Sequence, residues 1–157
     1  VMRDDITVRE TSLFGLYGYT SGRRSYGLVL RDTDIHPGLS FRVAEHKGDD
    51  AIPIFQSSYK EAISLLPANE WIHIAVSRVG NIFKLFIDGA LIKEEVHDIS
   101  IYNNTVDPLV IGSTGPTYTG PWTGLIDEFR ITKGVARYTE DFTPPREPFP
   151  NFKLATD

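Results

Sequence analysis

The sequence predicts an all-β protein, an antiparallel β-sandwich of the jelly-roll type with at most one or two short helical turns. Its dominant hydrophobic period is two. The run Phe-Lys-Leu-Phe-Ile-Asp places Phe83, Leu85 and Ile87 on one face and polar residues mainly on the other, the pattern of a half-buried strand. Asp88-Gly89 then predicts a hairpin turn, because glycine adopts positive φ without steric cost. Short strands separated by turn residues are typical of sandwiches and barrels.

The other strands follow from the same pattern in chain order. Each is a short apolar run bounded by turn residues, and the last of them would return beside residues 83–88 after the hairpin turn. The expected strands are 13–17, 26–31, 39–44, 71–76 and 90–96.

Helix has few places in this chain. Ser58 and Glu61 have the spacing of a capping box, and Pro67 would end a helix, so residues 58–66 are compatible with a helix as well as with a strand. A second short helical turn is expected at residues 133–137.

Residues 124–132 are expected to form another strand. On strict alternation Leu125, Asp127, Phe129 and Ile131 share the core face, which would bury the Asp127 carboxylate. A buried charge without a partner costs of order 2 to 7 kcal/mol or more. We therefore expect Asp127 to accept backbone N–H groups, with a metal role as the alternative.

Length and composition indicate one domain. With 157 residues, 41% hydrophobic and 24% charged, the chain is long enough for one core, and we expect a single domain over residues 1–149. The net charge of −5 without a basic cluster argues against a nucleic-acid partner. No apolar run reaches the roughly 18 to 20 residues of a membrane span, so we expect no membrane insertion, and we see no signal peptide. A homo-oligomer is compatible with the sequence.

The last fifteen residues, 143–157, are rich in proline and phenylalanine. Proline has no backbone donor for a β-ladder, so this tail cannot be a central strand. We expect a C-terminal strap whose phenylalanines pack on the domain, and the alternative is a linker to a further module or partner.

Several motifs together resemble a known family. They are residues 71–76 (Trp-Ile-His-Ile-Ala-Val), 85–89 (Leu-Phe-Ile-Asp-Gly), 124–132, 133–138 and the stop at Phe142-Thr143-Pro144-Pro145. In combination they are similar to the concanavalin A-like lectin/glucanase superfamily, and in particular to laminin-G-like domains of phage virion and tail proteins. The resemblance implies a jelly-roll sandwich with a strand at residues 58–66, so we favour strand over helix there. It also implies a virion location, with assembly in the host cytoplasm.

Catalysis is disfavoured by the acidic residues. Asp127 and Glu128 are adjacent, so in a strand they point to opposite faces and cannot flank one glycosidic bond. The glucanases of this superfamily carry their catalytic acids in the order Glu-x-Asp-x-x-Glu. The flanking glutamates are absent here. We expect a protein that is not an enzyme.

Calcium is the one cofactor that the resemblance raises, because laminin-G-like domains often hold it through loop carboxylates. Weak candidates are Asp32 and Asp34 in one loop, together with Asp127. The full Asp-x-Asp-x-Asp-Gly loop is missing, so we favour solvated turns, and nothing in the sequence requires the ion. The four histidines lack zinc-site spacing.

Sugar sites typically combine an exposed aromatic ring with polar groups that bind hydroxyls. Two loops have this composition, one at residues 112–122 and one in the hairpin at residues 17–26, where two arginines would suit an anionic group. Packing roles are the alternative for the aromatic residues, and a solvated turn for the hairpin. The candidate ligand-binding residues are Tyr118, Trp122, Tyr17, Tyr19, Arg23, Arg24 and Tyr26.

Three functions follow in order. The first is a non-catalytic carbohydrate-binding module of a phage virion or tail fibre that recognises a cell-surface glycan of the host. The second is a virion decoration or assembly domain that binds other structural proteins, since a fold alone does not fix function. A glycoside hydrolase is the third.

Overall fold

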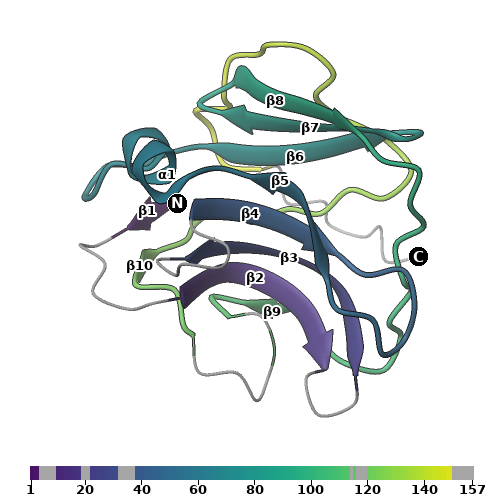
Figure 1. The fold of residues 1–157 in the computed structure, drawn as a ribbon. Coiled ribbons are helices and arrows are strands. Elements are labelled where there is room, and N and C mark those ends of the chain that lie inside the picture. The colour runs from purple at the N-terminus through teal and green to yellow at the C-terminus, as the bar shows by residue number, and fades with distance from the viewer. Residues whose placement is uncertain (4–9, 19–21, 32–37, 114, 116–119, 150–157) are drawn as a thin grey trace, which may run out of the picture.

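The computed structural model describes residues 1–3, 10–18, 22–31, 38–113, 115 and 120–149. In this part of the chain two antiparallel sheets lie one above the other, with a short two-stranded ladder at one end (Figure 1). The predicted antiparallel β-sandwich is confirmed. No helix in the described residues is long and apolar enough to cross a membrane.

The larger sheet has five strands in the order β5-β4-β3-β2-β9. Apolar side chains of β3, β4 and β5 enter the core, among them Leu30, Phe41 and Phe55. The bounds are β2 (Glu10–Gly18), β3 (Arg23–Arg31), β4 (Gly38–Val43), β5 (Ile52–Gln56) and β9 (Val110–Ile111).

The smaller sheet has three strands in the order β6-β7-β8: β6 (Ile74–Val79), β7 (Ile82–Ile87) and β8 (Ala90–Val96). The expected alternation is confirmed in β7, since Phe83, Leu85 and Ile87 all lie in the core. The predicted hairpin turn is also present, with Asp88 at φ 49° and Gly89 at φ 84°.

One hydrophobic core lies between the two sheets. Leu30 and Phe41 of the larger sheet and Phe83 of the smaller one belong to the same buried cluster. This packing joins the sheets into one unit, because each buries an apolar face that it could not bury alone.

The outer face of the smaller sheet is covered as well. Phe86 of β7 is fully buried on this side, under Tyr138 and Phe142 of the C-terminal segment. The two covering rings stack with centroids 3.6 Å apart, and the Phe142 N–H donates to the Gly89 carbonyl over 2.9 Å. Figure 1 shows this segment running over β7 and β8. Phe149 lies further along the same segment, and the centre of its ring is 3.8 Å from the Arg130 guanidinium.

Residues 58–66 form a helix, so the preference for a strand was wrong. Helix α1 (Tyr59–Leu65) begins with a complete capping box in which Glu61 N–H donates to Ser58 Oγ (3.2 Å) and Ser58 N–H to a Glu61 carboxylate oxygen (3.4 Å). Ala62 and Leu66 turn into the core. Residues 133–137 contain bends, and the expected second helical turn is not formed there.

The long strand expected at residues 124–132 was also wrong. Only β10 (Gly124–Leu125) is a strand, paired with β1 (Met2–Arg3), and Glu128 has a left-handed backbone with φ 50°. That conformation breaks the two-residue alternation. Leu125 and Asp127 alternate with Ile126, which packs against the core, so both are exposed, and the break at Glu128 separates their face from that of half-buried Phe129. Ile131 is exposed as well.

Candidate functional site

A shallow depression lies beside the hairpin that joins β2 and β3, where β4 ends. Its volume is about 270 Å³. The buried side chains of Val43, Ala44 and Ile99 form its floor, and it opens between the loop that follows β4 and the start of β5. The lining residues are Val43, Ala44, Glu45, Asp49, Asp50, Ile52 and Ile99.

Hydrogen bonds and ion pairs fix the carboxylates around this depression. Asp50 Oδ1 pairs with Arg24 Nη1 of β3 over 2.5 Å, and Glu45 Oε1 accepts the Ser100 N–H over 3.2 Å. Asp49 Oδ2 accepts the His46 N–H over 3.1 Å and contacts His46 Nδ1 over 3.0 Å. Each of the three acceptor groups thus has a partner within the protein, and the Asp50 side chain remains 92% exposed.

The same loop is tied to the hairpin by the backbone. Gly48 N–H donates to the Gly22 carbonyl over 2.6 Å, and Gly48 adopts φ 97°, a conformation that other residues rarely adopt. This backbone contact fixes the loop that follows β4 next to Gly22, which lowers the entropic cost of binding a ligand beside it.

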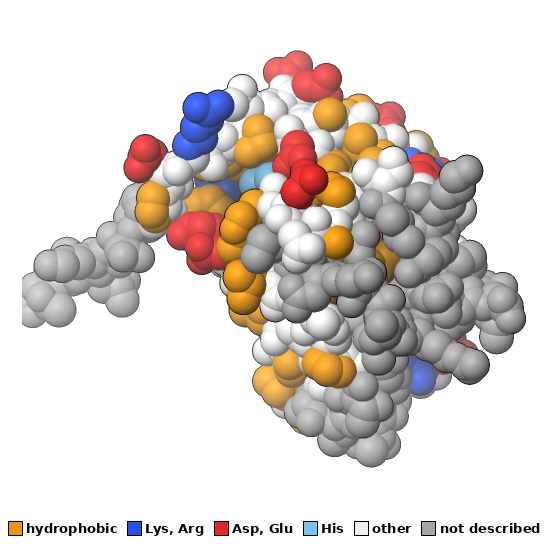
Figure 2. All heavy atoms as spheres, turned by 90° about the vertical axis from the view of Figure 1, so that its left-hand side faces the viewer, with side chains coloured by type: hydrophobic (Ala, Val, Ile, Leu, Met, Phe, Trp, Pro, Cys, Tyr) orange, Lys and Arg blue, Asp and Glu red, His pale blue; other side chains and the backbone are white. Residues whose placement is uncertain are grey.

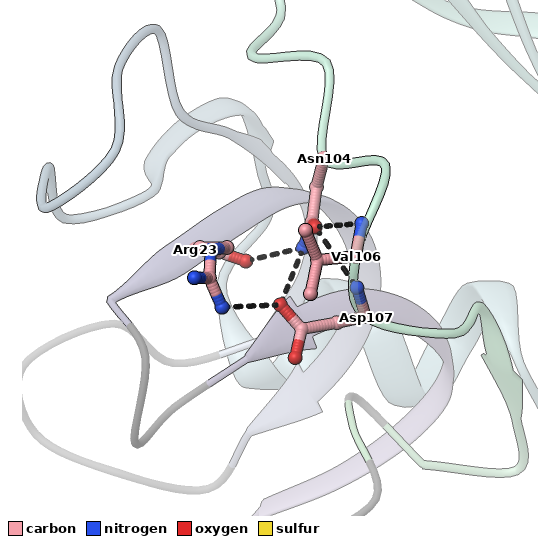
Figure 3. Close-up of polar contacts among 4 residues, drawn as sticks. All are labelled: Arg23, Asn104, Val106 and Asp107. Carbon is pink, nitrogen blue, oxygen red and sulfur yellow. Dashed lines mark hydrogen bonds and ion pairs between the residues drawn. The ribbon is translucent and has the colours of Figure 1, made fainter.

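A buried polar network supports the opposite side of the hairpin (Figure 3). The Asn104 amide nitrogen donates to the Arg23 carbonyl (2.8 Å) and to Asp107 Oδ2 (3.0 Å). The Asn104 amide oxygen accepts the N–H groups of Val106 and Asp107, each over 3.1 Å. Arg23 Nη1 lies 3.9 Å from the Asp107 carboxylate.

Both arginines predicted as ligand contacts therefore have acidic neighbours within the protein. Arg24 pairs with Asp50 at the depression and Arg23 lies beside Asp107 in the polar network. Such pairing neutralises much of the positive charge that an anionic ligand would need.

The predicted tyrosines of the hairpin differ in exposure. Tyr17 is only 2% exposed and packs with Ala44 and Ala51 in a small second cluster. Tyr26 is half-buried with its ring edge toward Phe14, and burial raises the pKa of its hydroxyl. Tyr19 lies outside the described residues.

In the loop at residues 112–122, Trp122 lies in the core, and its backbone N–H donates to the Gly112 carbonyl over 2.8 Å. Its ring packs on the core, which is the alternative considered for it. Tyr118 lies outside the described residues.

The metal candidates do not come together in the described part of the chain. Asp127 is exposed, so its expected burial was wrong, and its Oδ1 accepts the N–H of Glu128 over 2.8 Å. Asp32 and Asp34 lie outside the described residues. Within those that are described, no three His, Asp or Glu side chains are grouped as a cation site.

The sequence analysis missed Trp71 as a candidate contact, treating it only as part of a strand. Its side chain is 54% exposed, and of the aromatic side chains that the structure describes it is the exposed one. The alternation of side chains could have predicted this exposure. Ile72, Ile74 and Val76 face inward, so Trp71 lies on the outer face.

Comparison with known proteins gave one match. A laminin-G-type family model, described as the concanavalin A-like lectin/glucanases superfamily, matches residues 1–140. No curated protein and no solved structure matches the chain.

Proposed function

We propose, because the chain belongs to the concanavalin A-like lectin/glucanase superfamily, that it is a non-catalytic carbohydrate-binding module. Domains of this family suggest a carbohydrate-binding or adhesion-type role. The proposal extends to the setting: a phage virion or tail fibre, assembled in the host cytoplasm, in which the module binds a glycan of the host surface. The setting rests on the resemblance of the sequence motifs to laminin-G-like domains of phage proteins.

The depression beside the β2–β3 hairpin is the observation that supports sugar binding. Its apolar floor can contact the C–H face of a sugar ring, while the carboxylates of Glu45, Asp49 and Asp50 can accept hydrogen bonds from hydroxyl groups. Charged acceptors form hydrogen bonds about twice as strong as neutral ones. The three acidic groups repel an anionic sugar, so the proposal is for a neutral or amino sugar.

The proposed lack of catalysis is supported by the two adjacent acids at the end of β10. Glycosidases need two carboxyl groups that face each other across the scissile bond. Asp127 instead accepts a hydrogen bond from the N–H of Glu128, and Glu128 Oε2 accepts the Phe149 N–H over 2.7 Å. The two carboxylates are thus engaged separately by the backbone.

A glycan array, followed by titration with the best neutral glycan, tests the proposal. We expect saturable binding by the full chain and a loss of about tenfold in Asp50→Asn, which keeps the shape but removes a charged acceptor. Glu147→Gln, which changes an exposed carboxylate of the C-terminal segment, is the matched control and should bind normally. An array with no bound glycan would refute the proposal. Normal binding by Asp50→Asn would remove the depression as its site.

A virion decoration or assembly domain is the second candidate. Val79, Ile82 and Val96 are cross-strand neighbours at the end of the smaller sheet, and all three are exposed. An exposed apolar row can bind another protein. The second function is supported if no glycan on the array binds and the domain binds a purified capsid or tail protein. Val96→Asp should then abolish the binding of that protein.

A further inference from the structure

Strand β1 lies between two segments that are distant in sequence. Val1 and Ile72 exchange two backbone hydrogen bonds (2.6 and 2.7 Å), and Met2 pairs with Leu125 on the other side. Neighbouring strands are about 4.8 Å apart, so the backbones of segment 71–72 and β10 are separated by about 10 Å.

In segments 71–72 and 125–126, which flank β1, the first side chain faces solvent and the second faces the core. Ile72 and Ile126 face the core, so Trp71 and Leu125, one residue earlier in each segment, face outward. Each of the two is 54% exposed. The two exposed apolar side chains flank β1 on its outer side, and we call this surface the Trp71 face.

An exposed tryptophan in this position is unusual. Tryptophan is highly buried on average, and it is enriched among residues that dominate binding energy. Within the described residues the Trp71 side chain stays 54% exposed, whereas Tyr138 and Phe142 of the C-terminal segment bury Phe86 on the same outer face.

The backbone around Trp71 is fixed before any ligand binds. On one side Ile72 is held by Val1. Beyond it, the His73 N–H donates to Asp88 Oδ1 and the Asp88 N–H donates to the His73 carbonyl, both over 2.8 Å. A fixed aromatic platform loses little conformational entropy on binding.

The charge around the Trp71 face is acidic. Glu70 and Asp127 are exposed beside it. Burial lowers the pKa of the Val1 amino group, and the negative charges of Asp88 and Asp127 oppose this shift. Figure 2 views this end of the molecule and shows apolar and acidic side chains next to one another in part of the coloured area.

Two described cations act on the neighbouring His73, the Val1 amino group and Arg130, and both are already engaged. The Val1 amino group donates to the Ile72 carbonyl over 2.6 Å. Arg130 donates to the Tyr138 hydroxyl over 3.2 Å and lies over the Phe149 ring. An anionic ligand is therefore disfavoured at this face, whereas a neutral ring with C–H groups on one side and hydroxyls at its edge matches an aromatic platform with flanking carboxylates.

We infer that the Trp71 face is a second carbohydrate contact, at which the Trp71 ring stacks on a neutral pyranose and a flanking carboxylate accepts a hydroxyl hydrogen bond. This inference rests on the proposed function and adds a contact that the depression does not supply. Figure 1 places β1 and β10 at the end of the sandwich where β4 begins, and the depression lies at the end of β4. One long glycan or two separate chains could then engage both ends, which raises avidity.

The test uses the full chain and four neutral probes: maltohexaose, cellohexaose, laminarihexaose and chitohexaose. The chain has two tryptophans and Trp122 is buried, so acrylamide quenches mainly the fluorescence of Trp71. We expect at least one probe to bind saturably and to protect this fluorescence from quenching. Trp71→Ala should weaken binding about tenfold, whereas Trp71→Phe keeps an aromatic ring and most of the affinity. Val135→Ala, an exposed apolar change elsewhere, should have no effect.

The outcomes separate this inference from the proposed function. A probe that binds equally well to Trp71→Ala, but weakly to Asp50→Asn, overturns the Trp71 face and leaves the depression as the site. No binding by any probe or array glycan overturns both. Protection from quenching that rises with protein concentration alone means that a second copy covers Trp71, and this also overturns the inference.

Discussion

At the residue scale, His73 gives the stability a dependence on pH. Its ring edges face Tyr138 (centroids 6.0 Å) and Phe142 (5.4 Å), and its Nδ1 is buried without a hydrogen-bond partner among the described residues. Burial lowers the pKa of His73, and the charges of the Val1 amino group and Arg130 add to this, while Asp88 opposes them.

The sign of the effect follows from linkage. The folded pKa of His73 lies below the unfolded value of about 6.5, so the unfolded chain binds the proton first as the pH falls. The contribution is therefore complete above pH 6.5 and is lost as the pH falls through the folded pKa. We expect the free energy of unfolding in urea to fall from pH 7 to pH 5, and to fall less in His73→Phe. His46→Gln, at an exposed histidine, is the control, and an equal fall in wild type and His73→Phe would contradict the argument.

Individual residues show where sequence reasoning succeeds. The sides of Phe83, Leu85 and Ile87 were predictable because they lie in the regular β6–β7 ladder, where alternation is fixed by backbone geometry. The exposure of Asp127 was not, because Glu128 leaves the extended conformation one residue later. Trp122 could not be assigned either, since a loop tryptophan may equally pack inward or face solvent, and only the tertiary fold decides.

At the element scale, α1 depends on its first turn. Seven residues are too few for a helix that is stable alone, so the cap and the core contacts of Ala62 and Leu66 must compensate. We expect Ser58→Ala to lower the free energy of unfolding by about 1 kcal/mol, because Glu61 N–H loses its acceptor. Ser64→Ala, an exposed change in the same helix, should be neutral or stabilising by a few tenths of a kcal/mol. Urea unfolding measures both, and equal effects would argue against the cap.

The helix was visible in the sequence but outweighed by the family resemblance. The capping-box spacing of Ser58 and Glu61 is a local signal with a direct physical cause, and it proved correct. The resemblance placed a strand at the same residues by analogy alone. At an element boundary, therefore, the local hydrogen-bonding pattern carried more information than the general character of the family.

At the scale of the whole molecule, the period of two was sufficient to predict the two-sheet core, because each sheet must bury an apolar face against another element. The C-terminal layer was less predictable. Phe86 stood on the face expected to be polar, and its partners Tyr138 and Phe142 are more than fifty residues away in a segment without regular structure. No local sequence pattern encodes such a contact, so the layer that the C-terminal segment forms over β7 could be recognised only from the structure.

Attachment of this layer to the sandwich depends on Gly89 in the β7–β8 turn. A Cβ at Gly89 would overlap the carbonyl oxygen of Phe142, whereas one at Gly80 in the β6–β7 turn would meet nothing within 4 Å. Both glycines have positive φ, so each alanine variant bears a similar left-handed strain of about 1 kcal/mol. The difference between the free energies of unfolding of the two variants therefore measures the overlap with the Phe142 carbonyl. We expect Gly89→Ala to cost at least about 3 kcal/mol in urea unfolding, and hydrogen exchange to increase in β7 because Phe86 is uncovered. Gly80→Ala should leave β7 protected. Equal stability of the two variants would mean that the C-terminal layer does not hold the outer face of the sheet.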